Sequence, residues 1–187
     1  MDYVPVLTLW LPTLLSAVFV FVLSALIHTV LPYHHSDYRK LANEDDTLAA
    51  LRRLALPAGD YVVPCAGGMK GMKDPVFYEK WRQGPIVFMS VLRPEQAGMG
   101  ASLAGWFAYC LVVSVFAAYV AGRALAPGAH YLEAFRFAGT TAFAGYVLAL
   151  WQNTIWYKRK VSTALKYTFD GLVYALVTGG VFGWLYP

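Results

Sequence analysis

The chain has 187 residues, of which 58% are hydrophobic and only 14% are charged, and its mean hydropathy is +0.48. This composition excludes an ordinary soluble domain. The formal net charge is +4, but the basic residues gather between apolar stretches, which indicates membrane topology and not nucleic-acid binding.

Four long apolar stretches cover residues 4–31, 102–121, 132–156 and 165–185. A helix needs about 20 residues to cross a hydrocarbon core about 30 Å thick, and each stretch is long enough. Because lipid offers no hydrogen bonds to the backbone, stretches of this kind fold as helices. The sequence therefore predicts an all-α membrane protein with four transmembrane helices.

The predicted organisation has three parts. Residues 1–31 form the first transmembrane helix, residues 32–101 form a small α+β cytoplasmic insert, and residues 102–187 contain transmembrane helices two to four. The N-terminus lacks the basic region of a signal peptide, so we expect the first helix to be retained as an anchor. Most lysines and arginines lie in the insert or at 158–160. Loops rich in these residues stay in the cytoplasm, so both termini are expected outside.

The insert contains signals for two helices and two strands. Asn43 precedes three acidic residues and predicts a helix start, and Pro57 predicts its end. Asp74 followed by proline predicts a second helix that ends near Gly84. The runs 61–63 and 86–92 are typical of strands. A two-stranded sheet alone is only marginally stable in water. The apolar face of the sheet is therefore expected to be covered by a partner, by the bilayer or by the helices of the insert.

The fourth apolar stretch carries small residues four apart. Gly171, Ala175, Gly179 and Gly183 fall on one face of a helix and predict a helix-packing interface. The interface could lie within one chain. It could also join the chain to a protein partner or to a second copy of itself.

A polar cluster is predicted near the inner ends of the helices. His28 and Asp170 lie at similar depth, and Gln152 and Asn153 belong to the same layer. Ionisable groups in the bilayer are costly unless paired, so we expect a contact between His28 and Asp170. It could be a structural tie or a proton relay. With His28 free, that residue could instead be an axial ligand to haem or chlorophyll.

A second group of candidate ligands follows the first helix directly. His34, His35 and Asp37, with His28 nearby, could bind a transition metal. Adjacent histidines do not share a helical face. The competing interpretation is that these polar residues simply lie among the lipid headgroups where the first helix leaves the membrane. The sequence contains no nucleophile elbow and no paired carboxylates on one helix face, which disfavours an enzyme.

Three short sequence segments resemble those of a family of uncharacterised bacterial integral membrane proteins. They are residues 71–75 (GMKDP), 82–85 (RQGP) and 170–178 (DGLVYALVT). The resemblance implies a bacterial plasma membrane but no activity or ligand.

Three hypotheses on function follow. The first is a non-catalytic accessory or structural subunit of a larger membrane complex. The second is a metal- or tetrapyrrole-binding membrane protein that uses His28, His34 or His35. The third is a small oligomeric ion or solute carrier.

Overall fold

The computed structural model describes residues 3–187, and the chain is mostly helical, with one small sheet. It divides into two compact units. One combines the chain up to Arg39 with residues 100–187, and the other is Lys40–Met99. Residues 32–39, which the sequence analysis assigned to the insert, are therefore part of the helical unit.

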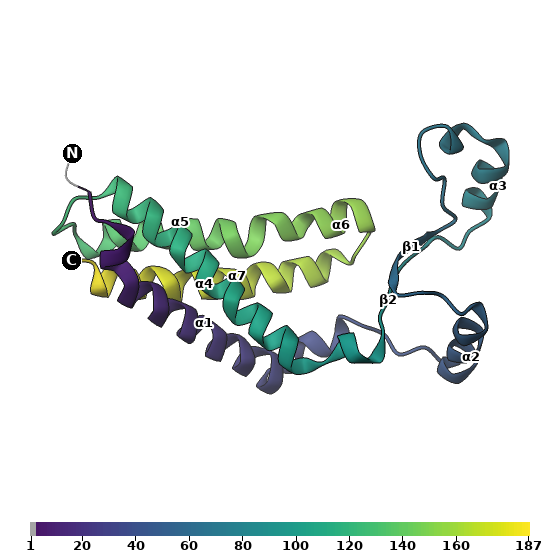
Figure 1. Ribbon diagram of the computed structural model, residues 1–187, viewed down its shortest axis with the longest axis horizontal. Helices are drawn as coiled ribbons and strands as arrows, with labels where there is room; N and C mark the ends of the chain where they lie inside the picture. The colour runs from purple at the N-terminus through teal and green to yellow at the C-terminus, as the bar shows by residue number, and fades with distance from the viewer. Residues whose placement is uncertain (1–2) are drawn as a thin grey trace. The chain divides into compact units, whose positions relative to one another are not determined.

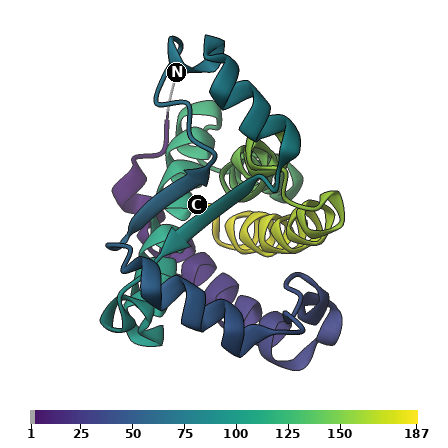
Figure 2. The same ribbon diagram turned by 90° about the vertical axis from the view of Figure 1, so that its right-hand side faces the viewer.

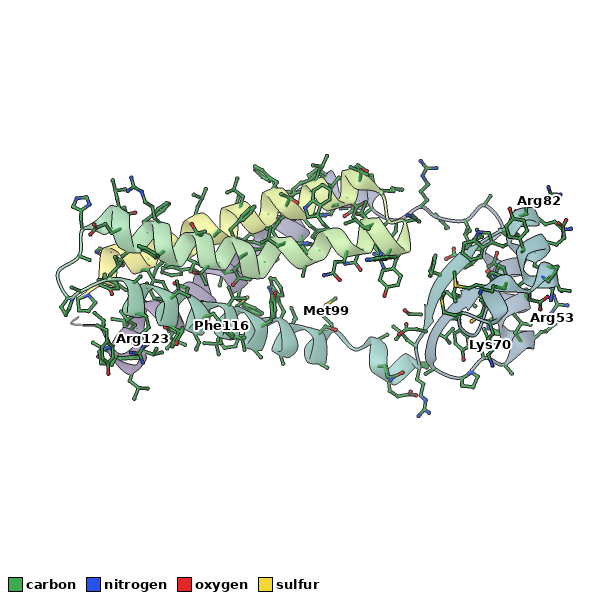
Figure 3. All side chains as sticks on the ribbon, turned by 90° about the horizontal axis from the view of Figure 1, so that it is seen from above. Arg53, Lys70, Arg82, Met99, Phe116 and Arg123 are labelled. Carbon is green, nitrogen blue, oxygen red and sulfur yellow. The ribbon has the colours of Figure 1, made fainter. Side chains whose placement is uncertain are left out.

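The helical unit is built from long helices, and the other unit is inserted in the chain between residues 39 and 100 (Figure 1). In chain order its elements are η1 (Val6–Leu9), α1 (Trp10–Val30), η2 (Pro32–Ser36), α4 (Met99–Ala124), α5 (Tyr131–Val147), η5 (Leu148–Leu150), α6 (Trp151–Tyr157) and α7 (Val161–Leu185). Figure 3 labels Met99, Phe116 and Arg123 along the course of α4.

Among the described residues, three helices are long and apolar enough to cross a membrane: Val6–Val30, α4 and α7. The chain is therefore a membrane protein. The predicted helix over 132–156 is interrupted, because α5 ends at Val147 and the 3₁₀ turn η5 separates it from α6. Next to this turn, Tyr109 donates a hydrogen bond of 2.6 Å to the Gly145 carbonyl. In an uninterrupted α-helix this carbonyl would accept from residue 149.

The small-residue stripe of α7 lies against α5. A Cβ atom added to Gly179 would stand 2.8 Å from the Phe135 carbonyl oxygen, and one on Gly171 would stand 2.3 Å from Val147. A Cβ atom added to Gly183 would stand 2.7 Å from the Tyr131 ring. These contacts require a bare backbone on α7, and they join two helices of one chain.

Both ends of the described chain lie at the same end of the helical unit. The Val4 amide donates to the Gly122 carbonyl at the end of α4. In the loop between α4 and α5, the Gly128 amide donates to the Pro187 carbonyl at 2.7 Å. Here an apolar cluster closes the bundle; its members are Val4, Leu9, Ala117, Ala118, Ala121, Ala138 and Phe182.

The other unit has no buried interior. Its elements are α2 (Glu44–Leu54), β1 (Gly59–Val63), η3 (Gly71–Lys73), α3 (Pro75–Gln83), β2 (Val87–Val91) and η4 (Pro94–Ala97). The two strands pair antiparallel, with Tyr61 opposite Met89 (Figure 2). Asp74 caps α3 by accepting from the Val76 amide, as its sequence predicts. None of residues 40–99 is buried, so the unit leaves its apolar side chains exposed or half-buried.

We predict that Gly179→Ala destabilises the bundle, because the new methyl group meets a backbone carbonyl that cannot rotate away. The expected loss is about 1–3 kcal/mol of the free energy of unfolding in detergent. The matched control is Gly180→Ala, whose nearest neighbour would be the Tyr131 hydroxyl at 3.8 Å. Equal stability of the two variants would contradict this account of the interface.

Candidate metal centre

A sharp turn after α1 brings η2 onto the side of α7. Leu31 is extended and Pro32 occupies the first position of η2. Lys166 of α7 then holds the segment, donating to Asp37 Oδ1 and Ser36 Oγ at 2.7 Å each and to the Tyr33 carbonyl. The segment that carries the predicted histidine pair is thus fixed against the bundle.

Asp170 is buried, with 1% of its side chain exposed, and has two side-chain partners. Tyr33 donates to Oδ1, and His34 Nε2 lies 2.9 Å from Oδ2. A carboxylate removed from water is tolerated only when its oxygens are paired, and η2 supplies both partners. Burial and the hydrogen bond to Asp170 raise the pKa of the Tyr33 hydroxyl, so Tyr33 stays a donor.

His34 connects two carboxylates. Its Nδ1 lies 2.7 Å from Asp37 Oδ2, on the opposite side of the ring from Asp170. Burial favours a higher pKa for Asp37, but hydrogen bonds and charge from Lys166 and His34 outweigh it and lower that pKa. Asp37 is therefore a carboxylate that orients the His34 ring.

His28 lies directly over His34. The two rings are parallel within 10° and their centroids are 4.4 Å apart. His28 Nδ1 lies 2.9 Å from the Ser24 carbonyl oxygen, an acceptor only, so this nitrogen carries the proton. In the neutral ring, Nε2 then keeps its lone pair for a ligand.

His28, His34 and Asp170 each offer one ligand atom, and these atoms lie within 4.8 Å of one another. Two imidazoles and one carboxylate are a common set for zinc and for non-haem Fe(II). Ligand atoms around a tetrahedral zinc ion stand roughly 3.3 Å apart, from bond lengths of about 2.0–2.1 Å. His28 is exposed, and for the set to close its ring would have to shift toward the other two ligands while keeping the Ser24 hydrogen bond.

Each of the three ligands also has a second partner. Asp37 binds His34, the Ser24 carbonyl binds His28 and Tyr33 binds Asp170. Metal-ligating histidines commonly donate their other nitrogen to a carboxylate or backbone carbonyl, which fixes the tautomer and the ring orientation. These second partners are the kind found around metal ligands, so they support a metal site beyond what the three ligands alone support.

The structure differs in part from the predicted polar cluster. Asp170 is paired with Tyr33 and His34, and no hydrogen bond between His28 and Asp170 is found in residues 3–187. Gln152 and Asn153 are exposed on α6, beyond the interruption at η5, and their place in the cluster stays a prediction.

The predicted ligand group after α1 is also divided. His34 and Asp37 come together, whereas the neighbouring His35 is exposed and is not part of the three-ligand group.

Sequence reasoning did not assign Tyr33 and Lys166 to the site. Lys166 is four residues before Asp170 and shares its helical face, which is a signal that could have identified it. Tyr33 carried no comparable signal, because its role depends on the turn at Leu31.

Comparisons of the chain with protein-family models, with curated proteins and with solved structures found no match. The site must therefore be interpreted from its own geometry.

We predict that Tyr33→Phe destabilises the helical unit, because it leaves Asp170 Oδ1 buried without its donor. Hydrogen bonds to charged groups are worth about 1.5–3 kcal/mol, and a loss of that size is expected in detergent unfolding. The control is Tyr38→Phe, since Tyr38 is exposed and accepts only a surface hydrogen bond from Arg159. A similar loss in both variants would argue against a special role for Tyr33.

Proposed function

We propose that this chain is a membrane-embedded metal-binding protein in which His28, His34 and Asp170 hold one divalent transition-metal ion. The observation that carries the proposal is the approach of the three ligand atoms to within 4.8 Å. The partners of His28 and His34 support it, since both rings can keep an Nδ1 proton that faces away from the site. The proton that joins His34 Nε2 to Asp170 Oδ2 would leave when the ion binds, because a metal ligand needs the Nε2 lone pair.

Three protein ligands leave coordination positions open. Structural zinc sites are closed by four protein ligands, whereas sites with three bind water or another small ligand as well. The proposed ion would therefore be accessible to exogenous ligands. The haem or chlorophyll alternative uses the same His28, and an absorption spectrum distinguishes the two.

We also propose that the chain crosses the membrane four times, with the termini outside and the insert in the cytoplasm of a bacterium. The hydrogen bonds from Val4 to Gly122 and from Gly128 to Pro187 support it, because an even number of crossings returns the chain to its starting side. The segment from α5 through α6 then supplies the fourth crossing. Basic residues in the insert and at 158–160 agree with this orientation.

A second candidate function is that of an accessory subunit in a larger membrane complex. The absence of buried residues between 40 and 99 favours it, because exposed leucine, valine and aromatic side chains in that unit suit a covering partner. The two functions are compatible, since the metal site lies entirely in the helical unit.

We predict that the purified, chelator-treated protein binds one Zn²⁺ or Co²⁺ per chain, and that His28→Ala weakens binding at least about tenfold. His28 bonds only to its own helix, so the variant should keep its fold. The control is His35→Ala, which removes an adjacent exposed histidine outside the ligand set. Metal titration with elemental analysis and the Co²⁺ absorption spectrum measure the result.

Absence of stoichiometric binding in the wild-type protein would contradict the proposal. Equal weakening by His28→Ala and His35→Ala would also contradict it, because the ion would then sit elsewhere.

For topology, we predict that Cys65 reacts with a membrane-impermeant maleimide only after cells are permeabilised. Cys65 is exposed in the insert, whereas Cys110 is buried and should stay silent. The converse result is expected for Ala126→Cys in a Cys65→Ser background, because this exposed position lies in the loop between α4 and α5. Labelling of Cys65 in intact cells would place the insert outside.

A further inference from the structure

Three buried hydroxyl groups in the described residues have no hydrogen-bond partner within the protein, and a fourth, that of Tyr146, meets only the weakly bonding thiol of Cys110. They belong to Ser16, Ser114, Tyr146 and Tyr174, and each residue is at most 5% exposed. A buried polar group without a partner is costly, and native proteins seldom leave several together. These four hydroxyls therefore need an explanation beyond the packing of the bundle.

Two of the four hydroxyls, those of Tyr174 and Tyr146, lie next to Asp170 toward the middle of the bundle. Tyr174 lies one turn after Asp170 on α7. Its ring meets that of Tyr146 edge to face, with centroids 5.5 Å apart. Tyr146 and Tyr174 belong to the same buried cluster as Cys110 of α4. The buried carboxylate is thus followed by two phenols and a thiol in the middle of the bundle.

The other two hydroxyls lie between α4 and α1. Ser114 is one turn after Cys110 on α4. These helices run antiparallel, with Trp106 bonded to Ser24 at 2.7 Å and the Leu9 side chain next to Gly122. This register brings Ser16 to the level of Ser114. We call the four hydroxyls and Cys110 together the hydroxyl line.

The two ends of the hydroxyl line differ in polarity. At one end, Asp170 binds Tyr33 and His34, and Lys166 behind them is partly exposed. Beyond Ser16 and Ser114, the bundle is closed by the apolar cluster that contains Leu9, Ala117 and Phe182. The Asp170 end is therefore the polar and partly exposed end of the line.

We propose that the hydroxyl line binds a file of ordered water molecules that begins at Asp170 and ends at Ser16 and Ser114. Water suits these groups because each hydroxyl is both donor and acceptor, and a buried water typically makes about three hydrogen bonds. Empty cavities in proteins are apolar, and this line is not. The file gives protons and water a one-sided path to the carboxylate from inside the bundle. It does not depend on a bound metal.

The native Cys110 serves as a reporter of water in the line. The experiment records the infrared S–H band of a Cys65→Ser variant after transfer into D₂O, with the protein reconstituted and metal-free. Cys110 is then the single thiol, and its S–H to S–D exchange measures contact with water. The matched control carries Cys65→Ser, Cys110→Ala and Ala117→Cys, because Cys110 and Ala117 are both 0% exposed on α4.

We expect Cys110 to exchange at least tenfold faster than the Ala117→Cys thiol, since the control thiol faces the apolar cluster. Equal rates at the two positions, whether fast or slow, would overturn the proposal. If the control variant does not fold, Ala121→Cys replaces it, because Ala121 is also 0% exposed in that cluster. Metal binding is measured separately, so failure of one proposal leaves the other intact.

Discussion

The pairing of the buried Asp170 carboxylate determines the arrangement of the inner part of the helical unit. A charge in this position is unfavourable unless each oxygen has a partner, and α7 itself supplies none. The chain meets this requirement by folding residues 33–37 back onto α7 directly after α1. Lys166 fixes the returned segment through Asp37, and Asp37 in turn orients His34. One buried carboxylate thereby ties α1, η2 and α7 together.

The helices associate in two different ways. α5 and α7 approach closely through bare glycine backbone, which suits lipid, where apolar surface alone gives little driving force. α4 is joined to its neighbours through larger side chains, including the Trp106–Ser24 and Tyr109–Gly145 hydrogen bonds. Two hydroxyls of the hydroxyl line come from α5 and α7 (Tyr146 and Tyr174), and the other two come from α1 and α4 (Ser16 and Ser114). The polar interior therefore draws on all four of these helices, including the pair that is most closely packed.

The sequence predicts local elements better than it predicts the site. Hydropathy located α1, α4 and α7, and capping and β-propensity signals located the insert helices and strands near the residues where they begin and end. The break after Val147 was not predicted, because the apolar run continues through it and the Tyr109 hydrogen bond comes from another helix. Depth alone placed His28 and Asp170 in one layer. Tyr33 as a partner was not predictable, because one extended residue, Leu31, determines where it lies.

The interruption in the third apolar stretch has a consequence for the backbone of the proposed fourth crossing. α5 has 17 residues and is about 26 Å long at 1.5 Å per residue, whereas α4 has 26 residues and is about 39 Å long. α5 alone is shorter than a hydrocarbon core of about 30 Å, so the proposed fourth crossing would carry η5 inside the bilayer. Lipid cannot satisfy the backbone groups that an interrupted helix frees, so these groups would need protein partners or water. Tyr109 is one such partner, at the Gly145 carbonyl.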